Sequence, residues 1–338
     1  MPVDGRPIKR PVTVVTGFLG SGKTTLLSRA LGTPEMANTA VLVNEFGKVG
    51  LDHHLLRRAD ERTVLLEHGC VCCTTRDDLV EALLDLLDEE DRGAIPPLSR
   101  VVVETTGLAD PAPILYTVLS HPVLQHHYSV DLVVCTVDAV NGRLHLDDNP
   151  ESEKQVAAAD TIVVTKTDLL EDGAATRALI GELRNTNPSA RVVEASFGEI
   201  PTGELFRPPV GGHGSAAGAS GVGRHVSTTS STSLTLDGPV DWTGFGIWLS
   251  MLLHARGEEI LRVKGLLDVG GPGPVVLDGV QHVVHPPRHL DRWPDEDHRS
   301  RVVLIAKGIR SEELLASLEA FRPLVEAGPL MLQANAPV

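Results

Sequence analysis

Residues 17–24 read GFLGSGKT and match the phosphate-loop pattern G-x-x-x-x-G-K-[ST]. The apolar run PVTVVT at 11–16 precedes this stretch and the helix-like TLLSRAL at 25–31 follows it, as a strand and a helix would. In such a loop, backbone N–H groups surround phosphates, a lysine reaches the β and γ oxygens, and a hydroxyl binds Mg²⁺. We therefore predict a nucleotide site rather than an unliganded glycine-rich turn. The expected contacts are Gly17, Gly20, Ser21, Gly22, Lys23, Thr24 and Thr25, with Lys23 also catalytic and Thr24 a Mg²⁺ ligand.

The residues around the loop predict the fold class. From Pro11 to Glu194, short Val/Ile/Leu-rich runs alternate with helix-like segments, which is typical of a parallel sheet covered by helices on both faces. We expect an α/β P-loop NTPase domain with a doubly wound, mostly parallel sheet over residues 1–205. The clearest expected strands lie at 11–16, 40–44, 63–67, 100–105, 131–138 and 161–166.

A change in composition divides the chain. Residues 208–233 are so rich in Gly, Ser, Ala and Thr that they bury little apolar surface, and we predict a flexible linker over 206–233. After it, a helix-like segment at 242–254, strand-like runs at 260–269, 274–285 and 301–308, and an amphipathic segment from Ser311 predict a smaller α+β domain over 234–338.

Composition excludes several classes of protein. The formal charge of −15 repels phosphate backbones, so we expect no nucleic-acid partner. No leader pattern and no uncharged apolar run of about 18 residues occurs, which predicts a cytoplasmic protein without a membrane partner. The 4 cysteines do not form the framework of a disulfide-rich secreted domain.

The segment TKTD at 165–168 bears on which base is read. The carboxylate of Asp168 is expected to accept hydrogen bonds from the ring N–H and the exocyclic amine of guanine. The aliphatic stem of Lys166 would cover one face of the base. Adenine offers no such pair of donors, so we predict GTP as the nucleotide. The alternative role for Asp168 is to cap the next helix.

A carboxylate also follows the strand-like run at 100–105. Glu104 is placed to hold a magnesium-bound or attacking water, and the N–H of Gly107 to meet the γ-phosphate. We therefore predict Glu104 as catalytic and Gly107 as a nucleotide contact. The alternative for Glu104 is a helix-terminal or salt-bridged carboxylate, since acidic residues are common where strands meet loops.

Three of the cysteines, Cys70, Cys72 and Cys73, form the cluster C-x-C-C, and such thiolates suit Zn²⁺, Co²⁺ or a similar ion. Adjacent cysteines do not easily face one tetrahedral centre together with a third, so we expect a further ligand, Glu45 or His68. A reversible disulfide and simple packing of buried thiols are the alternatives. The fourth cysteine, Cys135, lies in the apolar run LVVCTVD, which predicts burial.

These segments together resemble the CobW family of P-loop GTPases, relatives of the nickel chaperones for urease and hydrogenase. The resemblance covers nearly the whole chain. It implies that GTP and Mg²⁺ order the loops around Glu45 and the cysteines into a metal site, with Zn²⁺ favoured over Co²⁺ or Fe²⁺. Hydrolysis would then loosen the site and deliver the metal to a client metalloprotein. The resemblance rests on GFLGSGKTT at 17–25, NEFG at 44–47, GCVCC at 69–73, ETTGLADP at 104–111, TKTD at 165–168 and LRVKGLLDV at 261–269.

Two residues depart from the family pattern. Thr165 stands where guanine-reading motifs usually carry Asn, and we expect the loss of an amide that braces the P-loop. His68 stands where Asn is common, and its imidazole is a possible additional metal ligand or an exposed loop side chain. Among the C-terminal histidines, His282 and His285 would lie on opposite faces of one strand, which argues against a preformed metal site there.

Other functions remain as alternatives. Within the same machinery, the chain could be dedicated to one metalloenzyme, as an activator that inserts iron or cobalt into nitrile hydratase or a cobalt-handling protein of cobalamin synthesis. A P-loop kinase for a small metabolite would need acceptor-binding residues and a lid in place of TKTD and C-x-C-C. A thiol redox sensor would form a reversible disulfide in the cysteine cluster.

Overall fold

The structure is a computed structural model, and it describes residues 9–43, 76–170, 173–207, 229–325 and 333–335. Two compact units form, one largely from residues 1–208 and one largely from residues 209–338. Among the described residues, no helix is long and apolar enough to cross a membrane.

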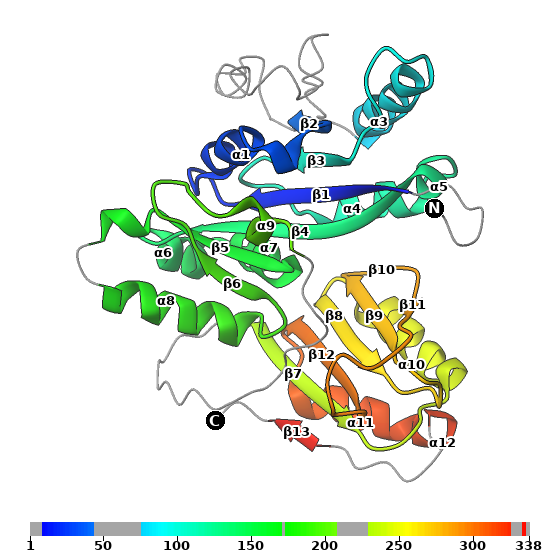
Figure 1. Cartoon of the computed structure of the whole chain (residues 1–338). Coiled ribbons are helices and arrows are strands. Elements are labelled where there is room, and N and C mark those ends of the chain that lie inside the picture. The colour runs from blue at the N-terminus through cyan, green and yellow to red at the C-terminus, as the bar shows by residue number, and fades with distance from the viewer. Residues whose placement is uncertain (1–8, 44–75, 171–172, 208–228, 326–332, 336–338) are drawn as a thin grey trace. The chain divides into compact units, whose positions relative to one another are not determined.

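The first unit is built on a six-stranded sheet in the order β2-β3-β1-β4-β5-β6 (Figure 1). All four pairings among the first five strands, β2–β3, β3–β1, β1–β4 and β4–β5, are parallel. The apolar runs predict this arrangement, because strands of a parallel sheet are buried on both faces. The strand predicted at 63–67 lies outside the described residues. The strands are β1 (Arg10–Gly17), β2 (Thr39–Val43), β3 (Arg100–Glu104), β4 (Tyr128–Asp138), β5 (Thr161–Thr165) and β6 (Arg191–Glu194).

Helices surround this sheet and bury its apolar side chains. Leu26, Leu27 and Leu31 of α1 pack with Val15, Val102 and other strand residues, while α4 and α7 contact β4. These helices complete the doubly wound α/β fold. Their bounds are α1 (Lys23–Leu31), η1 (Pro34–Met36), α3 (Arg76–Asp91), α4 (Ala112–Ser120), α5 (Leu124–His127), α6 (Gly142–Asp148), α7 (Pro150–Ala158), η2 (Thr167–Leu169), α8 (Gly173–Thr186) and α9 (Thr202–Leu205).

The parallel strands place four polar or glycine residues along one edge of the sheet. β1, β3, β4 and β5 end at Gly17, Glu104, Asp138 and Thr165. Because the carboxyl ends of parallel strands meet at the same edge, this is where an open α/β sheet binds its ligand.

The second unit is an antiparallel sheet in the order β10-β9-β8-β12-β7-β13, with β11 paired to β9. Phe245 and Trp248 of α10 and Leu314 and Leu318 of α11 pack on one face of it, which confirms the α+β class. Its elements are β7 (Thr229–Leu236), α10 (Trp242–Arg256), β8 (Ile260–Leu267), β9 (Val275–Val280), β10 (Val283–Val284), β11 (Arg288–His289), β12 (Ser300–Lys307), α11 (Ser311–Ala320), α12 (Arg322–Val325) and β13 (Gln333–Asn335).

Two features of this unit differ from the sequence prediction. β7 begins at Thr229, inside the predicted linker, because its Ser/Thr-rich residues alternate with the buried Leu234 and Leu236. The run at 274–285 is a hairpin rather than one strand, since the backbone turns at Gln281 with a φ of 52° and Val283 pairs with Val280. His282 and His285 therefore lie outside the strands, so the argument from opposite faces was wrong.

Candidate nucleotide site

The P-loop closes tightly on the end of β4. Gly17 has a φ of 136°, and a Cβ there would lie 2.3 Å from the Thr136 hydroxyl, so only glycine fits. The Ser21 hydroxyl in turn lies 2.6 Å from that of Thr136. Gly20 and Gly22 also have a positive φ, at 70° and 95°. The loop therefore has the curled backbone that the sequence pattern predicts.

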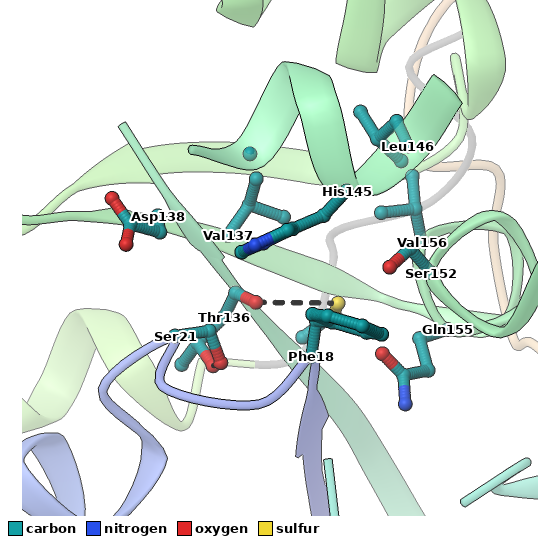
Figure 2. Close-up of a pocket in the computed structure, with 12 residues that line it drawn as sticks. Phe18, Ser21, Thr136, Val137, Asp138, His145, Leu146, Ser152, Gln155 and Val156 are labelled. Atoms are coloured by element: carbon teal, nitrogen blue, oxygen red, sulfur yellow. Dashed lines mark hydrogen bonds between the residues drawn. The ribbon is translucent and has the colours of Figure 1, made fainter. Parts of the chain in front are cut away.

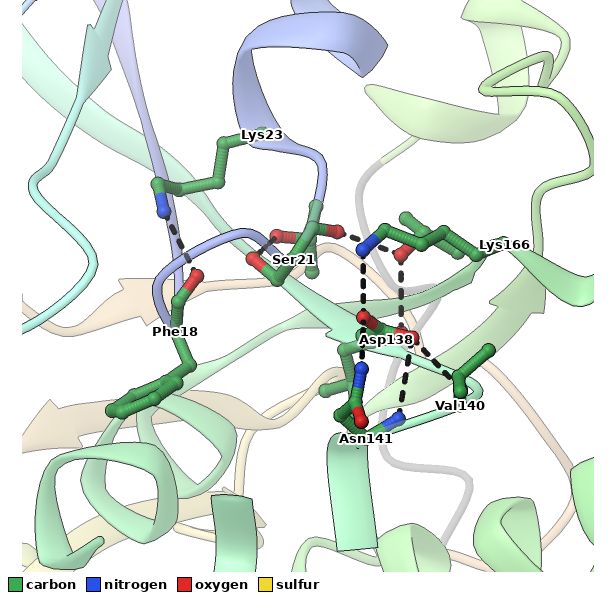
Figure 3. A network of polar contacts seen from close by, with 10 residues as sticks. Phe18, Ser21, Lys23, Asp138, Val140, Asn141 and Lys166 are labelled. Atoms are coloured by element: carbon green, nitrogen blue, oxygen red, sulfur yellow. Dashed lines mark hydrogen bonds and ion pairs between the residues drawn. The ribbon is translucent and has the colours of Figure 1, made fainter. Parts of the chain in front are cut away.

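Lys23 begins α1 and turns its ammonium back into the loop. Its Nζ donates to the carbonyl oxygens of Gly17 at 2.8 Å and Phe18 at 3.1 Å, and the residue is only 8% exposed. Figure 3 shows the contact between Lys23 and Phe18. The cation is thus held inside the curve where phosphate oxygens would lie. Thr24 and Thr25 follow it in the first turn of α1.

Thr24 and Glu104 come together from α1 and the end of β3. The Thr24 hydroxyl donates to Glu104 Oε1 over 2.6 Å, and Glu104 is 4% exposed. A hydroxyl and a carboxylate are the hard oxygen ligands that Mg²⁺ prefers. The pair therefore fits a magnesium ion beside the P-loop.

The loop that connects β3 to α4, residues 105–111, lies against the P-loop. A Cβ on Gly107 would stand 2.5 Å from the Leu19 backbone nitrogen, so a larger residue would push the two loops apart. Gln155 of α7 donates from Nε2 to the carbonyl oxygens of Gly107 and Ala109 at 3.1 and 3.0 Å. Sequence reasoning did not single out Gln155, because no local motif marks it.

Asp138 is a second residue that sequence reasoning missed. Its buried carboxylate accepts from Lys166 Nζ at 2.7 Å, from the Val140 N–H at 2.7 Å and from Asn141 (Figure 3). Burial acts to raise the pKa of Asp138, but these hydrogen bonds outweigh it and hold the pKa below its ordinary value. The carboxylate thus fixes the Lys166 side chain at the edge of the site. The available signal was its position at the end of a buried strand.

Asp168 lies in η2 beside a segment that follows β6. Its Oδ1 accepts from the Phe197 N–H over 2.7 Å, and the neighbouring Thr167 hydroxyl donates to the Ala195 carbonyl over 3.2 Å. Phe197 has a φ of 54° and is 67% exposed. Residues 195–197 are therefore held beside Thr167 and Asp168 by two hydrogen bonds, which the sequence alone did not indicate.

Thr165 corrects one expectation. Its hydroxyl donates to the Ser21 carbonyl over 2.6 Å and is 3.3 Å from the Val137 carbonyl. Threonine thus supplies the brace between β5 and the P-loop that we expected to be lost with the asparagine amide. The hydroxyl reaches because β5 and the P-loop approach closely: a Cβ on Gly22 would lie 3.6 Å from it.

The predicted transition-metal ligands Glu45, His68, Cys70, Cys72 and Cys73 lie outside the described residues. Among the residues that are described, no group of three or more His, Cys, Asp or Glu side chains could hold a metal ion. Cys135 is buried, as predicted, and burial raises the pKa of its thiol to about 12.

Both units of the chain match the models of known protein families. The model of the CobW/HypB/UreG nucleotide-binding domain matches residues 11–194, and that of the cobalamin synthesis protein CobW C-terminal domain matches residues 229–322. The chain belongs to the CobW family of P-loop GTPases. Family membership confirms the resemblance, the predicted fold class and the predicted class of enzyme.

Individual relatives agree over nearly the whole chain. The zinc chaperone YjiA of Escherichia coli K12 is 36% identical over 326 residues, 92% of this chain and 98% of that protein. The zinc chaperone CobW of Pseudomonas aeruginosa is 31% identical over 344 residues, 88% of each chain. The crystal structure of Zn(II)-bound YjiA GTPase from E. coli matches with a TM-score of 0.69 and 31% identity, covering 94% of this CobW-family chain and 100% of that one.

Proposed function

We propose that this chain is a cytoplasmic, GTP-dependent metallochaperone that carries Zn²⁺ and delivers it to a client metalloprotein. The observation that carries the nucleotide half is the 2.6 Å contact between Thr24 and Glu104 at the mouth of the P-loop. The zinc half is supported by relatives that are named zinc chaperones and match nearly the whole chain.

The P-loop residues would hold and polarise the triphosphate. The ammonium of Lys23, now on the Gly17 and Phe18 carbonyls, would exchange these for the β and γ oxygens of GTP. Thr24 and Glu104 would hold Mg²⁺, which neutralises charge on the transferred phosphoryl group. The carboxylate of Glu104 would also orient the attacking water.

The far side of the site would select guanine. The carboxylate of Asp168 would accept from the ring N–H and the exocyclic amine, with Oδ1 oriented by the Phe197 N–H. The Lys166 stem, held through its ammonium by Asp138, would cover one face of the base.

The cargo half involves the segment outside the described residues. Cys70, Cys72 and Cys73, together with Glu45 or His68, would bind Zn²⁺ when GTP orders the loops, and hydrolysis would release it. Because binding free energies are linked, a nucleotide that favours zinc binding must itself bind more tightly when zinc is present.

The proposal is tested by measuring hydrolysis and zinc stoichiometry on the same reduced protein. We expect Mg²⁺-dependent hydrolysis of GTP in preference to ATP, and one Zn²⁺ per chain in the presence of a nonhydrolysable GTP analogue. Cys72→Ala should lose the zinc, while the matched variant Cys135→Ala, which removes the buried cysteine outside the cluster, should keep it. Preference for ATP, or zinc retained at full stoichiometry in Cys72→Ala, would overturn the proposal.

A further inference from the structure

Gln155 is a buried polar side chain that connects α7 to the β3–α4 loop. The residue is 0% exposed, and its Nε2 donates to the Gly107 and Ala109 carbonyls. One donor group thus satisfies two carbonyls of a loop that belongs to no helix or strand. Figure 2 shows Gln155 with Ser152 on the wall of the pocket that Phe18 of the P-loop also lines.

The loop held by Gln155 lies beside the P-loop, in the phosphate half of the nucleotide site. It begins directly after Glu104, and its Gly107 abuts Leu19 of the P-loop with no room for a side chain. A second contact from α7, between Lys154 Nζ and Asp110 Oδ2 at 3.5 Å, fixes the far end of the same loop. α7 therefore anchors the segment that would have to move if the γ-phosphate repositioned Gly107.

The P-loop side of this arrangement is also fixed by packing. The Phe18 ring lies against the ring of His145 from α6, with centroids 4.5 Å apart. Figure 2 shows this pair at the same pocket as Gln155. The P-loop is thus fixed by α6 and the β3–α4 loop by α7, so the distance between Leu19 and Gly107 depends on both anchors.

We infer that Gln155 is a positioning residue that holds Gly107 where it meets the γ-phosphate, so that the site distinguishes GTP from GDP. This inference rests on the proposed GTPase function. GDP contacts the P-loop and base-binding residues but does not reach the position of the γ-phosphate. Loosening the β3–α4 loop should therefore weaken the binding of triphosphate and slow hydrolysis while leaving GDP affinity nearly unchanged.

The test compares two variants of the full chain. Gln155→Met keeps the length of the side chain and removes the Nε2 donor. Ser152→Ala is the matched control, because Ser152 lies on the same helix and lines the same pocket. Its buried hydroxyl has no hydrogen-bond partner among the described residues. Affinities for GDP and for a nonhydrolysable GTP analogue are measured by calorimetry, together with kcat and the midpoint of thermal unfolding.

For Gln155→Met we expect GDP affinity to stay within about twofold, and analogue affinity and kcat each to fall about tenfold, which lies within the range for the loss of the two hydrogen bonds to Gly107 and Ala109. Ser152→Ala should match the wild type in all of these. An equal loss of GDP and analogue affinity in Gln155→Met would show a merely structural role and overturn the inference, as would no change in either.

If Gln155→Met does not fold, Gln155→Asn, which keeps the carboxamide but is one methylene shorter, should weaken analogue binding selectively and by less. An equal loss for both nucleotides in that variant would also overturn the inference. Because the affinities are measured without turnover, failure of the wild type to hydrolyse GTP would count against the proposed function and not against the role of Gln155.

Discussion

The Thr165 hydroxyl donates a 2.6 Å hydrogen bond to the carbonyl oxygen of Ser21. This bond joins the end of β5, which leads into the segment proposed to read the base, to the middle of the P-loop. Both residues are buried, at 3% and 1% exposure. The Thr165 side chain thus links the P-loop to the strand end that precedes the proposed base-reading residues.

Removing this hydroxyl should weaken nucleotide binding. Thr165→Val keeps the shape of the side chain but leaves the Ser21 carbonyl without this donor, at a cost of about 1–1.5 kcal/mol or roughly tenfold in GDP affinity. Thr161→Val is the matched control, because Thr161 lies in the same strand with a buried hydroxyl that has no hydrogen-bond partner in the described part of the chain. Equal GDP affinities for the two variants in calorimetry would contradict the bracing role.

Changing Asp168 should change which base is bound. Asp168→Asn keeps an oxygen for the Phe197 N–H but replaces one carboxylate oxygen with a donor that faces the donors of guanine. We expect GDP affinity to fall about 10- to 100-fold, as for a hydrogen bond to a charged group, with ADP affinity unchanged. A parallel loss for ADP would show that the variant damages the fold rather than base recognition.

Asp138 should make stability depend on pH in the acid range. Its pKa is lower in the folded protein than its ordinary value, so its contribution is present above about pH 4 and is lost as the pH falls through the folded-state pKa. Asp138→Asn should reduce the free energy of unfolding by about 1–3 kcal/mol at pH 6. Denaturant titrations at pH 6 and pH 3 should show this difference shrinking at pH 3.

The control for that measurement is Asp147→Asn, an exposed carboxylate on α6, which should stay within about 0.5 kcal/mol of the wild type at both pH values. A difference between Asp138→Asn and the wild type that is the same at pH 3 as at pH 6 would count against a depressed pKa at this site.

Cys135 should be unreactive in the folded protein. Burial raises its pKa to about 12, so at pH 8 only about one thiol in ten thousand is ionised. The residue as a whole is only 1% exposed. Mass mapping after iodoacetamide treatment should find Cys135 unmodified in native buffer and modified in guanidinium chloride. Rapid modification under native conditions would contradict this prediction, because it would show that Cys135 of β4 is accessible to solvent in the folded protein.

Much of the fold follows from local signals. The apolar runs predict β1, β2, β3, β4 and β5 to within three residues at each end, because a strand buried on both faces must be apolar throughout. The P-loop is fixed by residues adjacent in sequence, so its motif can be read without a structure. The hairpin at Gln281 was missed because its turn has no glycine or asparagine to mark it.

The residues that hold the site together are harder to predict. Gln155 is 48 positions from Gly107, and Lys166 is 28 from Asp138. Such contacts depend on which strands become neighbours, and one sequence contains no pattern for them. Thr165 shows the same limit, since its identity suggested a lost brace and only the distance to Ser21 reveals that the hydroxyl replaces it.

The central claim is that the nucleotide controls metal binding, and one titration tests it most directly. The dissociation constant for Zn²⁺ is measured on reduced protein with Mg²⁺, first with a nonhydrolysable GTP analogue and then with GDP. Our account predicts binding at least about tenfold tighter with the analogue, which corresponds to a coupling free energy of about 1.4 kcal/mol. Equal dissociation constants in the two nucleotide states would contradict it.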